Sequence, residues 1–227
     1  MKLPNLFATL PWATRMILLV TVVVFLLQLM AGQSAFDAFA LWPIGAGDYS
    51  PEGGLVRTFM PWQLLSYSFV HAGFGHLFFN MLALVMFGAQ LEATWGRSKF
   101  LRYWFVCVAC AGLCQLLVLT WLLREQGVLG AAMGASGGVY GLVLAFGLMF
   151  PYQRVSIFPL PFLLKARTVA FAYVLLSLCY GLFSSGDGVA HFAHLAGMAA
   201  GWVMLKYNEE GGGRGKKTKK NHLRAVR

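Results

Sequence analysis

The chain is 227 residues long, and only 11% of its residues are charged, with a mean hydropathy of +0.66. Soluble domains carry about 25% charged residues, so the composition excludes an ordinary soluble enzyme and indicates a membrane protein. The formal net charge is +10. Lys206 and the seven cationic residues from Arg214 to Arg227 make up eight of the 18 Lys and Arg residues. This cluster favours contact with anionic lipid head groups over nucleic acid.

Six long runs without charged residues divide the chain. They are residues 16–36, 58–91, 103–123, 126–153, 168–186 and 188–205. Each contains an apolar stretch near the ~20 residues that a helix needs to cross the hydrocarbon core. The first run exceeds the ~7–15 residues of a secretory signal core, so we expect a retained helix rather than a cleaved signal. The predicted fold class is an all-α membrane protein with six transmembrane helices.

The distribution of Lys and Arg predicts the orientation of these helices. With the N-terminus inside, only Arg57 and Arg124 among the cations lie outside, so both termini are expected to be cytoplasmic. The predicted parts are a cytoplasmic lead (1–15), a membrane domain (16–206) and a basic, disordered tail (207–227). The outer loop, roughly residues 36–60, contains Trp42 and few charges, and we expect it to be partly buried at the membrane interface.

Polar side chains within a bilayer are costly, so each one in these spans is a functional candidate. The second span carries His71, His76 and Asn80, Ser136 opens the fourth, and the sixth carries His191 and His194. All three spans enter from the outside, and His194 is about 10 Å in at ~1.5 Å per residue. A shared depth on three helices favours a common site over packing.

Small residues surround Ser136 in the segment GASGGVYG, residues 134–141. On the sixth span, Gly197 and Gly201 form one stripe with His194 and allow two helix backbones to approach closely. The glycines expected to pack at the site are Gly134, Gly137, Gly138, Gly141, Gly197 and Gly201. We expect this close approach to bring His194 within reach of Ser136.

A serine and a histidine in hydrogen-bond contact act as a nucleophile and its general base. We predict that Ser136 is the nucleophile and His194 the base. No Asp or Glu lies at this depth, so the prediction is a dyad, with Tyr140 one turn below Ser136 lying against the imidazole ring. His76 and Asn80 share a helix face, and we expect both to stabilise the oxyanion together with the Ser136 N–H.

Three short motifs stand on the three spans that carry these residues. They are HLFFN at 76–80, GASG at 134–137 and AHFAHLAG at 190–197. Together, and in this order, they resemble the rhomboid family of intramembrane serine proteases. The resemblance covers most of the chain, from the outer loop to about Leu205, and implies the six-helix bacterial form.

The resemblance implies the same roles that depth and spacing predict. Ser136 matches the nucleophile, His194 the base, His76 and Asn80 the oxyanion residues, and Tyr140 the ring that stacks on the base. It also implies single-pass membrane proteins as substrates, cut near their outer ends after entering sideways near spans two and five. The expected location is a bacterial inner membrane, with the site open to the extracytoplasmic side. The chain departs from the family in one respect: many members have Trp-Arg before the second span, whereas here Gln63 follows Trp62. This departure concerns the anchoring of the outer loop and not the chemistry.

Other functions fit some of these residues. GASGG matches the G-x-S-x-G elbow of soluble hydrolases, but that motif needs a preceding strand, and residues 126–133 do not resemble one. The histidines also allow a metal-binding protein or a histidine-lined transporter, and a non-catalytic relative would bind membrane proteins without cutting them. Helical zinc proteases use H-E-x-x-H, whereas no acidic residue accompanies the histidines here.

We therefore expect no metal and no cofactor. His71 and His191 are predicted to lie at the rim of the site, near water, without a catalytic role. The segment 183–188, which contains two serines and two glycines, is expected to act as a flexible cap over a polar cavity.

Overall fold

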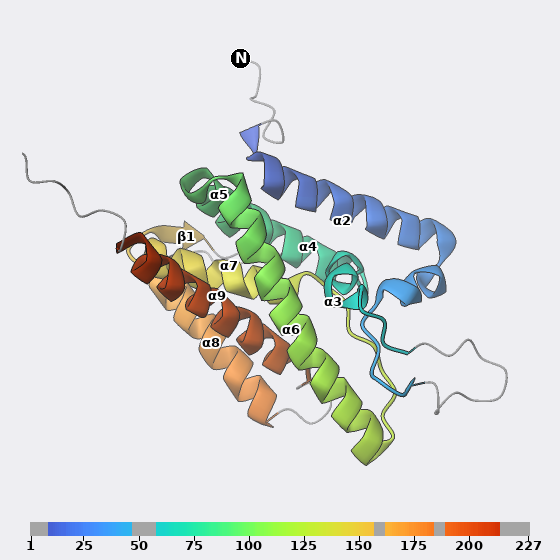
Figure 1. The fold of residues 1–227 in the computed structure, drawn as a ribbon. Helices are drawn as coiled ribbons and strands as arrows, with labels where there is room; N and C mark the ends of the chain where they lie inside the picture. Colours follow the sequence, from blue (N-terminus) through green and yellow to red (C-terminus); the bar gives the residue numbers. More distant parts are fainter. Residues whose placement is uncertain (1–8, 47–57, 157–161, 184–188, 214–227) are drawn as a thin grey trace, which may run out of the picture.

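The computed structural model describes residues 9–46, 58–156, 162–183 and 189–213, and helices predominate in it (Figure 1). The longer helices are α2 (Trp12–Ala31), α4 (Phe74–Ala83), α5 (Ala89–Trp95), α6 (Arg97–Gln126), α7 (Ser136–Met149), α8 (Ala166–Phe183) and α9 (Val189–Gly213). The short elements are the 3₁₀ helices η1 (Gln33–Phe39) and η3 (Tyr67–Phe69), helix α3 (Gln63–Ser66), the π-helical turn η4 (Leu84–Gly88), and strands β1 (Arg154–Ser156) and β2 (Leu163–Lys165). The two strands form an antiparallel ribbon between α7 and α8.

Within the described residues, three helices are long and apolar enough to cross a membrane. They are Trp12–Ala31, Phe74–Trp95, which joins α4, η4 and α5, and Arg97–Gln126. Helix α7 and the part of α8 at Ala166–Cys179 are also apolar but shorter. The prediction of a helical protein with apolar spans is confirmed in this coarser form, the β1–β2 ribbon departs from the predicted all-α class, and the count of six spans stays a prediction.

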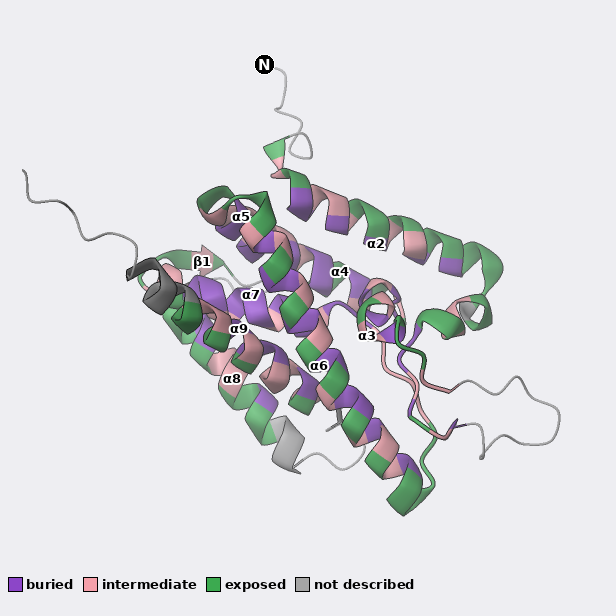
Figure 2. Cartoon of the chain, in the orientation of Figure 1, coloured by how far each residue is buried: buried purple, intermediate pink, exposed green. Residues whose placement is uncertain are grey.

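Helix α7 lies at the centre of the fold. It packs against α6, α8 and α9, and α6 and α9 also pack against each other. Figure 2 shows α7 largely buried, whereas α2 and α6 each present an exposed face. Because neighbouring helices enclose α7, most of its side chains contact protein.

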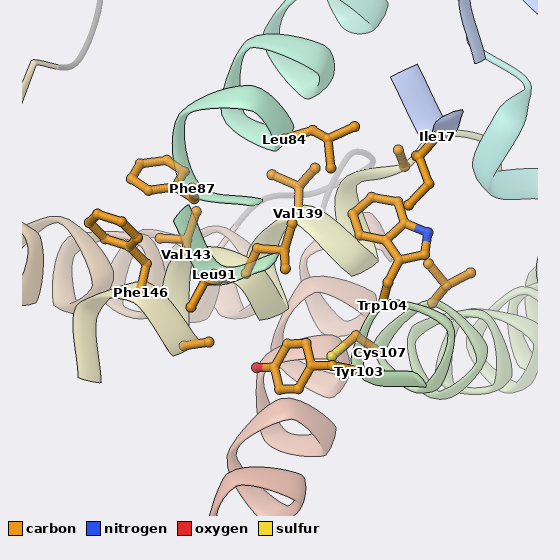
Figure 3. Close-up of a cluster of buried hydrophobic side chains, with 14 of the residues drawn as sticks. Ile17, Leu84, Phe87, Leu91, Tyr103, Trp104, Cys107, Val139, Val143 and Phe146 are labelled. Atoms are coloured by element: carbon orange, nitrogen blue, oxygen red, sulfur yellow. The ribbon is translucent and has the colours of Figure 1, made fainter. Parts of the chain in front are cut away.

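Large side chains from several helices fill the space beside α7 (Figure 3). Phe87 from η4 meets Phe146 from α7 edge to face, with ring centroids 5.2 Å apart. On the α6 side, Trp104 and Tyr103 are almost fully buried, and the Tyr103 hydroxyl donates a 2.8 Å hydrogen bond to the Gly141 carbonyl. This core fixes α7 against both α6 and the η4 turn.

A buried carboxylate holds the first turn of α2. Glu92 on α5 is 4% exposed and accepts hydrogen bonds from the Ala13 and Thr14 N–H groups, both at 2.7 Å, and from the Thr14 hydroxyl at 2.8 Å. The first N–H groups of a helix lack partners within the helix, and its N-terminus favours negative charge. Glu92 thus ties α2 to α5, and α2 begins at Trp12, within the residues predicted as the cytoplasmic lead.

The second predicted span is interrupted. A continuous helix was expected within residues 58–91, but η3 ends at Phe69, and α4 begins only at Phe74. Between them, the backbone N–H and C=O of His71 pair with the side chain of Gln28 on α2, at 3.1 Å each. Buried peptide groups need partners, and here α2 supplies them in place of helical hydrogen bonds.

The described part of the outer loop is partly buried, as predicted. Ala40 and Leu41 are fully buried, whereas Phe39 and Ile44 remain exposed. Leu41 exchanges two backbone hydrogen bonds with Ala132, at 2.8 and 2.9 Å. The loop is thus joined to the segment that leads into α7.

Some predicted features fall partly outside the described residues. Residues 47–57 of the outer loop, 184–188 of the expected cap and 214–227 of the basic tail are not described. Helix α9 continues past Lys206 as far as Gly213, within the predicted tail.

Candidate active site

Ser136 is the first residue of α7 and is half-buried. Gly134 precedes it with φ +119°, a conformation that L side chains rarely adopt. The Gly134 N–H donates to the Tyr67 carbonyl at 2.9 Å. Because the first N–H groups of a helix have no acceptor within it, the backbone at Ser136 offers a donor beside its own hydroxyl.

His194 on α9 meets Ser136 directly. Its Nε2 lies 2.8 Å from the Ser136 Oγ, and its ring stacks on Tyr140 with centroids 4.0 Å apart and an interplanar angle of 11°. Among the described residues, no group hydrogen-bonds the buried Nδ1 of His194. Aromatic stacking therefore holds this ring where a carboxylate holds it in a triad.

Helix α4 brings His76 to the turn before Ser136 and carries Asn80 one turn further along. The His76 ring lies against Gly134, where a Cβ would be 2.5 Å from Cε1 of the imidazole. Asn80 is 6% exposed and donates one amide hydrogen to the His76 carbonyl at 2.8 Å. One potential donor from α4, the His76 ring, therefore lies beside the turn that leads into Ser136.

The glycines near the site bring three helices together. A Cβ on Gly197 would overlap the Gly137 carbonyl oxygen, so α9 and α7 touch through their backbones. Gly141 faces both Cys107 on α6 and the Gly197 carbonyl, whereas Gly201 faces the Tyr103 hydroxyl on α6. The stripe on α9 thus divides: Gly197 meets α7 and Gly201 meets α6.

The prediction that His71 lies at a wet rim is wrong. His71 is fully buried, and its ring meets that of His76 edge to face with centroids 5.0 Å apart. His191 is half-buried, and its ring lies 5.7 Å from that of His194 at 86°. In the described part of the chain, no group of three or more His, Cys, Asp or Glu residues is arranged to hold a metal ion.

Two contacts near the site were not foreseen from the sequence. Gln28 binds the backbone of His71, and Tyr173 on α8 lies edge to face on Tyr140, with centroids 5.1 Å apart. Gln28 carried a usable signal, because a polar side chain deep in an apolar span is a functional candidate. Tyr173 carried none, because aromatic residues are common in apolar helices.

Comparison with known proteins identifies the family. Residues 58–208, about two thirds of the chain, match the Rhomboid domain. The chain belongs to the rhomboid family. It is 29% identical to Rhomboid protein 1, mitochondrial, of Saccharomyces cerevisiae over 153 residues, 65% of this chain and 43% of that protein.

Two further relatives are rhomboid proteases by name. The chain is 26% identical to Rhomboid protease GlpG of Yersinia pestis over 192 residues, 84% of this chain and 60% of that protein. It is 26% identical to Rhomboid-like protease 3 of Toxoplasma gondii over 154 residues, 67% of this chain and 54% of that protein. The chain spans 43% to 60% of the length of these relatives. It is therefore a multi-pass membrane protein homologous to rhomboid serine proteases.

Gln63, which stands where the resemblance implies an arginine, anchors the outer loop. It is 2% exposed, and its Oε1 accepts hydrogen bonds from the Trp42 and Met60 N–H groups at 3.2 Å each. Its Nε2 donates to the Ala38 carbonyl at 3.2 Å. A neutral amide both accepts and donates, so this rhomboid holds its loop without a charged side chain.

Proposed function

We propose that this rhomboid is an intramembrane serine endopeptidase that works with a Ser136–His194 dyad. The observation that carries the proposal is the 2.8 Å contact between His194 Nε2 and Ser136 Oγ, made across two helices with Tyr140 behind the ring. A nucleophile within hydrogen-bond reach of an oriented base is the arrangement that acyl transfer requires. Homology to named rhomboid proteases supports the same reaction.

Each side chain has a defined task in this mechanism. Ser136 Oγ attacks the carbonyl carbon of the substrate peptide bond while His194 Nε2 takes the hydroxyl proton. His194 then gives that proton to the leaving amine, and the same base activates the water that hydrolyses the acyl-enzyme. With Nδ1 protonated, Nε2 is the acceptor that the first step needs.

The negative charge that develops on the carbonyl oxygen needs donors. The Ser136 N–H, the His76 ring and the second amide hydrogen of Asn80 are proposed to supply them. The contact of His76 with Gly134 supports this role for the ring, and the 2.8 Å bond from Asn80 to the His76 carbonyl leaves the second amide hydrogen of Asn80 available. Loss of one such donor typically costs about 10²–10³ in rate.

The topology proposed for the active protein has six spans, with both termini in the cytoplasm. Figure 1 shows the start of α2, the α5–α6 connection, β1 and the end of α9 toward one end of the helices. These segments carry Arg15, Arg97, Arg154 and Lys206, which supports a cytoplasmic position for that end. Ser136 then opens toward the extracytoplasmic side of a membrane, which we take to be a bacterial inner membrane whose anionic lipids contact the basic tail.

Single-pass membrane proteins are the proposed substrates, cut near their extracytoplasmic ends. Helix α8 packs chiefly on α7 and α9, whereas α4 packs chiefly on η4, α7 and α2. Sideways entry between α4 and α8 therefore needs fewer contacts to be broken than entry beside α6 and α9, which pack extensively against each other.

Cleavage of a single-pass reporter protein by the purified chain in detergent tests this function. Wild type is expected to cut it with or without a chelator, whereas Ser136→Ala and His194→Ala are expected to lose activity to the uncatalysed level. Undiminished cleavage by Ser136→Ala would exclude the mechanism. Loss of wild-type activity on chelation would favour the metal alternative, and binding without cleavage would favour a non-catalytic binder.

A further inference from the structure

His71 lies between the two parts of the site that the proposed chemistry uses. It is fully buried, and its Nε2 accepts a 3.4 Å hydrogen bond from the Ala135 N–H, the peptide group just before Ser136. The edge of its ring meets His76. One side chain thus contacts both the nucleophile-bearing turn and an oxyanion candidate.

The hydrogen bonds of the ring require one neutral form of His71. Nδ1 lies 3.4 Å from the Phe69 carbonyl oxygen, to which only a protonated nitrogen can donate. Nε2 faces a backbone N–H and must therefore carry the lone pair. The neutral tautomer with hydrogen on Nδ1 satisfies both contacts.

The segment around His71 holds two successive peptide groups ahead of Ser136. The Gly134 N–H donates to the Tyr67 carbonyl at 2.9 Å, and the Ala135 N–H donates to His71. Both donors are directional, so together they set the direction in which α7 begins. The position of the Ser136 hydroxyl and N–H follows from that direction.

The backbone of His71 is itself fixed by α2. Gln28, 3% exposed, donates its Nε2 hydrogen to the His71 carbonyl and accepts from the His71 N–H, both at 3.1 Å. A carboxamide matches the donor and acceptor of an extended peptide unit in this way. Helix α2, which supplies none of the proposed catalytic groups, is therefore connected to Ser136 through two buried side chains.

We propose that His71 is a positioning residue for the nucleophile, held in place by Gln28. This positioning role rests on the proposed function, because it assumes that Ser136 attacks the substrate. His71 acts through Ala135 and His76. Its loss should therefore lower kcat and leave KM unchanged, because substrate binding does not depend on the start of α7.

The test compares two replacements of His71 in the full-length protein. His71→Gln keeps an acceptor near the position of Nε2, whereas His71→Met fills similar volume without one. We expect His71→Met to lower kcat by about ten- to a hundredfold at constant KM, the range for a misplaced catalytic group. His71→Gln should retain most of the wild-type kcat, and the rate of fluorophosphonate labelling at Ser136 should follow kcat in both variants.

Controls separate positioning from stability. Glu92→Gln weakens the attachment of α2 only at Ala13 and Thr14, about 20 Å along the helix from Gln28 at ~1.5 Å per residue. It should therefore lower the unfolding temperature while leaving kcat near wild type. Wild-type kcat in folded His71→Met, or equal losses in the Gln and Met variants, would overturn the proposal. If His71→Met does not fold, Gln28→Leu decides: a reduced labelling rate supports the proposal, and a wild-type rate refutes it.

The two proposals fail in different ways. Cleavage by Ser136→Ala would remove the proposed function whatever the His71 variants do. An inactive Ser136→Ala beside a fully active, folded His71→Met would remove only the positioning role.

Discussion

The two halves of the proposed dyad are held by different forces. The turn before Ser136 is held by directional hydrogen bonds to Tyr67 and His71. The His194 ring is instead held by the face of Tyr140, and no described group bonds its Nδ1. The hydrogen-bonded half tolerates little displacement, whereas stacking on Tyr140 fixes the plane of the His194 ring without a directional bond at Nδ1.

Cleavage should be most sensitive to changes at the contact between α7 and α9 that joins Ser136 to His194. Because a Cβ on Gly197 would overlap the Gly137 carbonyl oxygen, Gly197→Val should push α9 away from α7 and break the contact between His194 and Ser136. We expect reporter cleavage to fall by at least about 10²-fold. Gly75→Ala is the matched control, since open space surrounds a Cβ there and activity should be unchanged. Equal activity of the two variants would show that the helices need not touch.

The value of kcat should be less sensitive to loss of the Tyr140 ring that supports His194. Tyr140→Leu removes the stacked ring, and an aromatic pair contributes about 0.5–1.5 kcal/mol beyond burial. We therefore expect kcat to fall about two- to tenfold, measured on the reporter with KM determined in parallel. Tyr140→Phe keeps the ring face and should remain near wild type. A similar loss in both variants would assign the effect to the hydroxyl and contradict the stacking account.

The smallest effect is expected at Tyr173, which contacts Tyr140. Tyr173 supports Tyr140 edge to face from α8 and does not stack on His194 itself. Tyr173→Leu should lower kcat by no more than about threefold, since only part of one aromatic contact is lost. A loss larger than that of Tyr140→Leu would mean that α8 acts on the site by another route.

Hydropathy and helical spacing predicted much of this protein. Each uncharged run overlaps a helix, and the four-residue spacing from Ser136 to Tyr140 anticipated a ring that the structure stacks against His194. These features depend on local composition and helix periodicity, which a sequence shows directly.

Hydropathy and helical spacing do not predict hydrogen bonds between residues far apart in the sequence. The break between η3 and α4 exists because Gln28, 43 positions away, supplies partners to the His71 backbone. The burial of His71 depends on the same contact, so its predicted place at the rim was wrong. Likewise, Glu92 on α5 binds the start of α2 and Gln63 on α3 binds the outer loop, through backbone groups that no local pattern identifies.

Labelling with a fluorophosphonate tests the central claim most directly. The reagent reacts with a serine hydroxyl that a neighbouring base has activated, and peptide mass spectrometry identifies the modified residue. We predict that wild type is modified at Ser136 alone, and that His194→Ala is not modified although it remains folded. Labelling of His194→Ala at the wild-type rate, or of another serine in the wild type, would contradict the Ser136–His194 dyad.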